Sequence, residues 1–285
     1  MKGPLLEAEG AWRGHDEEEL RVGRYARCTG VAFLLLLGAA YGGAAAALAA
    51  PGELPEPSAL RAAAQCALAA GVLLELFVDF FLYPGVTRDL EVFAIMKLAG
   101  KTAFLTTWIL YCQSVEMAAS AAAELLLLAG LPCPRLMAAA YRLAVVAAVL
   151  GIMLTLLFLK FNYFEEKWRA EVAAVWERRG YRFSLLALLG HVPSLPVAVL
   201  DVALVRDGRF LRLCDPALAA NVGLTLAFTA AWYAFIHLLW WATGYRSWPY
   251  PFLHAFDSVL KRLAFFAVVF AVLVAVMLPI QLLLA

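Results

Sequence analysis

Two polar residues within apolar stretches of this chain, Thr106 and His191, are of the types needed for nucleophilic catalysis. A threonine hydroxyl is a weak nucleophile at neutral pH and needs a general base within hydrogen-bond reach. Histidine is the usual base, because its ordinary pKa lies near neutrality. Just below the headgroups of a membrane, such a pair would meet both water and an acyl ester. One hypothesis is therefore hydrolysis of a lipid ester.

Each residue also has a structural explanation. A threonine in a membrane helix commonly bonds to a backbone carbonyl of the preceding turn, and a single histidine is commonly an interhelical contact. Pro193 and Pro196 follow His191 closely and would interrupt the backbone hydrogen bonds, which occurs where irregular backbone lines a cavity. The residue types alone favour the structural explanation, so the positions of the pair must decide.

The composition places both residues in a membrane protein. The chain has 285 residues, of which 64% are hydrophobic and 16% charged, whereas a soluble domain is about half apolar and about a quarter charged. The apolar runs are roughly 20 residues long, enough to cross a bilayer, and they lack the period-two alternation of a barrel. We predict an all-α, polytopic helical membrane bundle. The net charge of +1 argues against a nucleic-acid partner.

Seven apolar runs, separated by Pro and Gly, are candidate spans. They cover residues 29–50, 61–83, 103–129, 136–159, 183–205, 218–243 and 263–284. The predicted organisation is a cytosolic N-terminal segment over 1–28, an extra N-terminal span over 29–50 and a six-helix membrane core over 60–285. The Gly- and Ala-rich first span either packs closely on a neighbour or is a looser peripheral helix.

The charges of the loops predict the orientation. With seven spans, 17 Lys and Arg residues fall on the side of the N-terminus and 6 on the other, and basic loops face the cytosol. We therefore predict a cytosolic N-terminus, in the endoplasmic reticulum or the plasma membrane. The first run begins too late for a signal peptide, which predicts a retained anchor. The connector over 160–182 is either an interfacial helix or a solvated charged loop.

This topology puts Thr106 and His191 at one depth. Both lie about one to two turns inside spans that start on the cytosolic side, and their depths agree within roughly 5 Å. The loop after the sixth span enters from the same side and would form a third wall of the site. Its candidate residues are Tyr245, Trp248, Tyr250 and His254.

Other ionisable residues allow a different function. Glu75 and Asp79 lie four residues apart, where like charges on a helix repel. Together with Glu116 they could form a proton or ion relay, as in a transporter. Asp201 lies ten residues beyond His191, roughly 15 Å along a helix, and is too far away to orient that imidazole directly.

Motifs for other chemistries are missing from the sequence. There is no G-x-S-x-G, H-E-x-x-H, Walker or G-x-G-x-x-G pattern. The five cysteines show no paired spacing and are interpreted as packing residues. We expect no cofactor and no metal. His237 is interpreted as a structural or interfacial residue, and His15 is assigned no role.

Three segments resemble the FAR-17a/androgen-induced protein family over roughly residues 60–280. They are Ala103-Phe-Leu-Thr106 with Gln113, His191 with Leu195-Pro196 and Asp201, and Thr243-Gly244 with Trp248 and Tyr250-Pro251-Phe252-Leu253. Characterised members are multi-span membrane hydrolases that cleave fatty acid esters of hydroxy fatty acids with a threonine and a histidine. The resemblance implies that Thr106 is the nucleophile and His191 the base.

Two alternatives to the hydrolase remain open. The segment Thr106-Thr107-Trp108 and the helix with His191 and Asp201 are also similar to rolling-stone-like membrane proteins, which take part in cell fusion. This similarity implies a non-catalytic fusion or adhesion protein. The third possibility is the transporter. For the hydrolase, backbone N–H groups near Gly190 or the Trp248–Tyr250 turn are candidates for stabilising the oxyanion.

Overall fold

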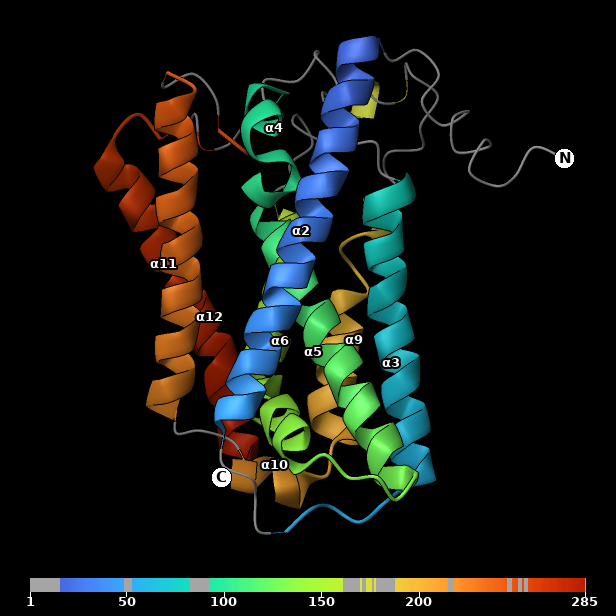
Figure 1. The fold of residues 1–285 in the computed structure, drawn as a ribbon. Coiled ribbons are helices and arrows are strands. Elements are labelled where there is room, and N and C mark those ends of the chain that lie inside the picture. Colours follow the sequence, from blue (N-terminus) through green and yellow to red (C-terminus); the bar gives the residue numbers. More distant parts are fainter. Residues whose placement is uncertain are drawn as a thin grey trace, which may run out of the picture.

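Every regular element in the described part of the chain is a helix (Figure 1). The computed structural model describes residues 16–48, 53–82, 93–160, 170, 173–175, 177, 188–214, 218–244, 248–250, 253 and 256–284. The elements are α2 (Glu17–Ala47), α3 (Ala59–Phe77), η2 (Val78–Leu82), α4 (Phe93–Ala99), η3 (Gly100–Ala103), α5 (Leu105–Leu128), α6 (Pro134–Phe158), α9 (Ser194–Leu200), η5 (Asp201–Val205), α10 (Gly208–Cys214), α11 (Leu218–Ala242) and α12 (Val259–Leu284). The predicted all-α fold class is confirmed.

Six helical segments within these ranges are long and apolar enough to cross a membrane. They correspond to α2, α3, the run from α4 to α5, α6, α11 and α12. The chain is thus built as an integral, multi-pass membrane protein. Its N-terminal orientation stays a prediction. The expected interfacial helix over 160–182 lies mostly outside the described residues.

The region of the predicted span 183–205 differs from a regular helix. Residues 190–193 form turns, and the helix resumes at Ser194 and continues through η5, a π-helical turn. The piece Ser194–Val205 is too short to cross a bilayer by itself. Proline is disfavoured inside a helix because its ring clashes and it lacks an N–H group. His191 therefore lies within a break in the backbone and not two turns inside a regular helix.

α2 begins earlier than the predicted first span because its N-terminus is capped. Asp16 Oδ1 accepts a hydrogen bond from Glu19 N at 2.9 Å, and Glu19 Oε2 accepts one from Asp16 N at 3.3 Å. This reciprocal capping box satisfies two backbone donors at the helix start. In Figure 1, α2 runs along the outside of the bundle in front of α5 and α6.

The glycines of α2 show where this helix packs closely on its neighbours and where it does not. A Cβ added to Gly30 would lie 2.7 Å from Tyr111 Oη and 3.0 Å from a ring atom of Phe80, so α2 packs closely there. Gly38 and Gly42 have nothing within 4 Å of such a Cβ. α2 therefore packs closely on the bundle at Gly30, and Gly38 and Gly42 lie on a face of the helix that has no close neighbour among the described residues.

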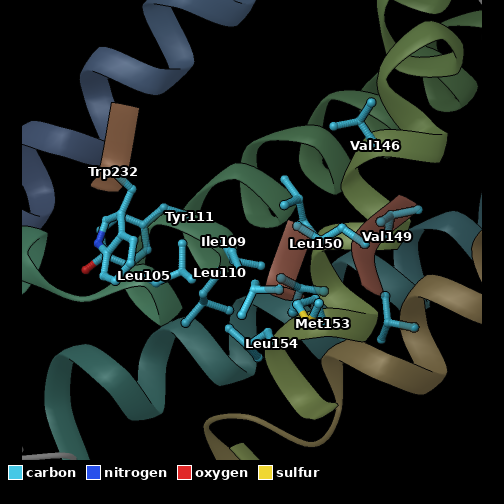
Figure 2. Packing of buried hydrophobic residues seen from close by; sticks show 14 of the residues in the cluster. Leu105, Ile109, Leu110, Tyr111, Val146, Val149, Leu150, Met153, Leu154 and Trp232 are labelled. Carbon is cyan, nitrogen blue, oxygen red and sulfur yellow. The ribbon is translucent and has the colours of Figure 1, made fainter. Parts of the chain in front are cut away.

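The antiparallel pair α5 and α6 forms the centre of the bundle (Figure 2). Buried apolar side chains of both helices interlock with Trp232 of α11; those labelled are Leu105, Ile109, Leu110, Tyr111, Val146, Val149, Leu150, Met153 and Leu154. Lipid tails are as apolar as these side chains, so close packing stabilises the contact more than exclusion of water does. In α6, 72% of the most apolar stretch is buried, against 11% in α2.

Two polar contacts fix the register of this pair. A Cβ on Gly151 would lie 2.7 Å from Gln113 Nε2, so the amide of Gln113 occupies the space left by the glycine. Nearer the other end of α5, Tyr141 Oη donates to Glu124 Oε1 at 3.0 Å. Both contacts pair α5 and α6 in the same antiparallel alignment.

Gly100 supports a close approach of α2 and generates a testable prediction. Its φ is +55°, and a Cβ there would lie 2.8 Å from Ala26 Cα. Gly100→Ala should lower the free energy of unfolding by about 1–3 kcal/mol, because alanine is strained in this conformation and would displace α2. Unfolding in detergent, followed by circular dichroism, measures the change. The control Gly42→Ala should leave stability unchanged or slightly raised, and equal losses in both variants would contradict the packing.

Candidate functional site

Thr106 lies in the first turn of α5, where the backbone N–H groups need partners from outside the helix. α5 begins at Leu105, and Phe104 before it provides no side-chain cap. The first N–H groups of a helix have no partner within it. Here Thr106 N donates to Tyr250 Oη at 3.2 Å, and the Thr106 hydroxyl and the Leu105 backbone are further partners of that oxygen. The Tyr250 oxygen thus occupies the positive end of the helix dipole.

Tyr250 is the part of the predicted third wall that contacts Thr106. Burial raises the pKa of its phenol, and the hydrogen bonds from Thr106 and Leu105 lower it in part. The phenol is therefore neutral at physiological pH and retains a proton to donate. Its ring lies 5.9 Å from that of Phe104, edge to face. Of the other three expected members of this wall, Trp248 stacks on Trp240, and Tyr245 and His254 lie outside the described residues.

His191 is anchored to the last turns of α6. Its ring stacks on Phe158 with centroids 4.5 Å apart and an angle of 16°. Its carbonyl oxygen accepts a hydrogen bond from Thr155 Oγ1 at 2.6 Å. These contacts hold the turn that precedes α9 against the end of α6.

The register of α5 and α6 places Thr106 level with His191. Gln113 of α5 lies opposite Gly151 of α6. Thr106 is seven residues before Gln113, and Phe158, on which His191 stacks, is seven residues after Gly151, so Thr106 and Phe158 lie at the same level. Seven residues are about two turns, so Thr106 also shares the face of Gln113. That face points to the region of His191, because Gln113 Nε2 donates to Ser194 O at 3.3 Å. The two residues thus share one end of the bundle, and their direct contact belongs to the proposal below.

Arg206 lies one residue past the predicted span 183–205 and is one of the six basic residues that the charge count assigned to loops on the far side. Its side chain is fully buried. Nε lies 2.7 Å from Asp201 Oδ2, and Nη2 lies 2.5 Å from Glu116 Oε1. Nη1 donates to Ala140 O and Nη2 also to Ser120 Oγ, both at 2.9 Å. The charge is buried because α5, α6 and η5 together satisfy the guanidinium.

Two carboxyl groups share this single guanidinium. Asp201 uses its other oxygen to accept a hydrogen bond from Gln65 Nε2 of α3 at 2.7 Å. Glu116 keeps Oε2 buried and without a partner in the described part of the chain. Sequence reasoning singled out both acids but missed Arg206, since a cation two residues before Gly208 resembles the start of a loop.

Glu75 and Asp79, expected to repel each other, point to different partners. Glu75 accepts hydrogen bonds from Ser194 N at 2.9 Å and Ser194 Oγ at 2.6 Å, which caps α9. Asp79 pairs with Lys101 Nζ at 2.9 Å and accepts from Tyr111 Oη at 3.3 Å. The π-helical turn η2 starts between the two acids, and its wider winding turns Asp79 away from Glu75.

Among the described residues, no group of three or more His, Cys, Asp or Glu side chains could hold a metal ion. Comparison with known protein families, characterised proteins and solved structures finds no match. The resemblance to the FAR-17a/androgen-induced protein family therefore rests on the motifs around Thr106, His191 and Tyr250.

The buried cluster predicts a large effect of removing its cation. Arg206→Met would leave the carboxyl groups of Asp201 and Glu116 buried without a counter-charge, which costs about 3–5 kcal/mol. Titration with a denaturing detergent measures this loss of stability. Arg209→Met is the matched control, because its side chain is 81% exposed, and should change stability by less than about 0.5 kcal/mol. If Arg206→Met has the stability of the wild type, the guanidinium does not hold the helices together.

Proposed function

We propose that this protein is an intramembrane lipid-ester hydrolase with Thr106 as nucleophile and His191 as general base. The observation that carries the proposal is the position of Thr106, in the first turn of α5, beside Tyr250 Oη and level with His191. A nucleophile at a helix N-terminus has positive potential beside it, where an oxyanion forms. The family resemblance adds the substrate class, esters like the fatty acid esters of hydroxy fatty acids.

The first half-reaction would form an acyl-enzyme. Thr106 Oγ1 attacks the acyl carbonyl while a ring nitrogen of His191 takes the hydroxyl proton. The backbone N–H groups at this helix start already donate to Tyr250 Oη, so the Tyr250 hydroxyl would donate its own proton to the tetrahedral oxyanion. The intermediate then collapses, the ester C–O bond breaks, and the imidazolium of His191 protonates the departing alcohol.

The second half-reaction restores the enzyme. A water molecule loses a proton to His191 and attacks the acyl-threonine. Collapse of the second tetrahedral intermediate releases the fatty acid, and Thr106 recovers its proton from His191. The oxyanion donor proposed here is the side chain of Tyr250, whereas the sequence suggested backbone N–H groups near Gly190 or in the Trp248–Tyr250 turn.

The contacts of the acids favour the hydrolase over a transporter. A proton relay needs acids that can exchange protons along a path across the membrane. Glu75 is held by Ser194, Asp79 by Lys101 and Glu116 by Arg206. Each carboxyl group has a structural partner, which gives these acids a role in holding helices together.

Hydrolysis by the purified protein tests this proposal. With a fatty acid ester of a hydroxy fatty acid in detergent micelles, the wild type should release fatty acid, detected by mass spectrometry. Thr106→Ala and His191→Ala should each lower kcat by about a hundredfold or more, because nucleophile or base is lost. Thr106→Ser keeps a hydroxyl and should retain part of the activity.

The matched control is Thr229→Ala on α11. The Thr229 hydroxyl donates to Thr225 O at 2.7 Å, within its own helix, so this variant should hydrolyse the ester at the wild-type rate. Equal rates in wild type, Thr106→Ala and His191→Ala would exclude the mechanism. A folded wild type without ester hydrolysis would favour the non-catalytic alternative.

A further inference from the structure

A cluster of aromatic and basic side chains lies between α11 and the first turn of α12. It consists of Tyr233, His237, Trp240, Trp248 and Arg262, which we call the Arg262 cluster. The rings of Trp240 and Trp248 stack 4.7 Å apart. The guanidinium carbon of Arg262 lies 4.8 Å and 5.1 Å from their centroids, so cation–π attraction holds the cation against this wall.

Arg262 forms no ion pair among the described residues. Arg262 is only 5% exposed. Its Nη1 donates to Phe256 O at 2.7 Å, and its Nε is buried with no partner in this part of the chain. The nearby acid Asp257 instead pairs with Lys261 at 2.8 Å. A buried cation without an anion costs free energy, and an oxyanion is the ligand that a guanidinium fits best.

Two more polar atoms of the cluster are buried and have no partner within the described residues. They are His237 Nε2 and Tyr233 Oη. The two rings lie 4.1 Å apart, and the charge of Arg262 acts on both groups. His237 Nδ1 lies 2.9 Å from Tyr233 O and so carries the donated proton. Nε2 can therefore take the proton of an acidic head group and then donate to its oxyanion.

The surroundings of the cluster suit a ligand that carries an acyl chain. Large apolar side chains near these ends of α11 and α12 are exposed, as expected for surfaces that face lipid; they are Leu238, Trp241, Val259, Leu260 and Leu263. In Figure 1, α11 and α12 lie together at one side of the bundle. The cluster is close to the ends of both helices, where Trp, Tyr and Arg meet lipid headgroups.

We propose that the Arg262 cluster binds the oxyanion head group, carboxylate or phosphate monoester, of a single-chain amphiphile. Arg262 and Tyr233 donate to the oxygens, and His237 holds the shared proton. Trp248 of this cluster is two residues from Tyr250, the partner of Thr106. The cluster and the candidate nucleophile therefore both contact the short segment 248–250. The inference concerns binding and does not depend on hydrolysis by Thr106.

Equilibrium binding of radiolabelled laurate to the purified protein in a neutral detergent tests the proposal. The wild type should bind laurate saturably, and Arg262→Gln should weaken binding at least about tenfold, because charge-assisted hydrogen bonds are lost. The control Arg209→Gln, at a cation paired loosely with Glu53 at 3.9 Å, should bind as the wild type does. Unchanged affinity in Arg262→Gln would overturn the proposal.

Competition experiments show whether the site binds the head group, the acyl chain or both. Dodecyl phosphate should displace laurate, whereas dodecanol and inorganic phosphate should not. Displacement by dodecanol would show that the chain alone is bound, and displacement by inorganic phosphate would show a site for free anions. Either result overturns the assignment. If Arg262→Gln does not fold, Tyr233→Phe and His237→Gln take its place, and each should weaken laurate binding while keeping the thermal stability of the wild type.

Discussion

A buried guanidinium connects the helices at the centre of this bundle. Arg206 bonds to side chains of α5 and η5 and to a backbone carbonyl of α6. Asp201, one of these partners, also accepts a hydrogen bond from Gln65 of α3. In a bilayer no water is at hand to satisfy these groups, so they must find one another inside the protein. The four elements can slide or rotate only by breaking charge-assisted hydrogen bonds, and this constraint sets their relative positions.

A second set of polar contacts lies further along the same helices, toward Thr106 and His191. Glu75 of α3 caps α9 through Ser194, and Gln113 of α5 bonds to the carbonyl of the same residue. Two layers of polar contacts thus fix α3, α5 and α9 along their lengths. The break before α9 is held against α6, and the first turn of α5 comes level with it. The positions of Thr106 and His191 follow from these interactions together with the contacts of His191 to Thr155 and Phe158.

The sequence predicted the helical class and the spans well, because long apolar runs leave few other structures in a membrane. It predicted that Thr106 lies about one to two turns inside its span, whereas the structure places it in the first turn of α5, after the short 3-10 turn η3. It could not show that Arg206 and Arg262 are buried. Each follows an apolar run or loop as a surface cation would, and its burial depends on groups distant in the sequence. For Arg206, Glu116 is 90 residues away.

The break at His191 was only partly predictable. Pro193 and Pro196 signal irregular backbone, but the helix start at Ser194 depends on the cap from Glu75, 119 residues earlier. The contact of Tyr250 with Thr106 is similar, since 144 residues separate the two. Periodicity and charge counts report on one segment at a time, whereas the candidate site is assembled from segments that meet only in the folded bundle.

Cysteine cross-linking tests most directly whether Thr106 faces His191. The five free cysteines (Cys28, Cys66, Cys112, Cys133 and Cys214) are first replaced by alanine. A disulfide forms readily only when the two Cα atoms lie within about 7 Å. Gln113→Cys with Gly151→Cys should cross-link under mild oxidation as a positive control. Thr106→Cys with His191→Cys should be joined by a short bifunctional thiol reagent, because the longer histidine side chain sets the two Cα atoms further apart. A control pair that cross-links while the 106–191 pair does not would contradict the proposed catalytic pair.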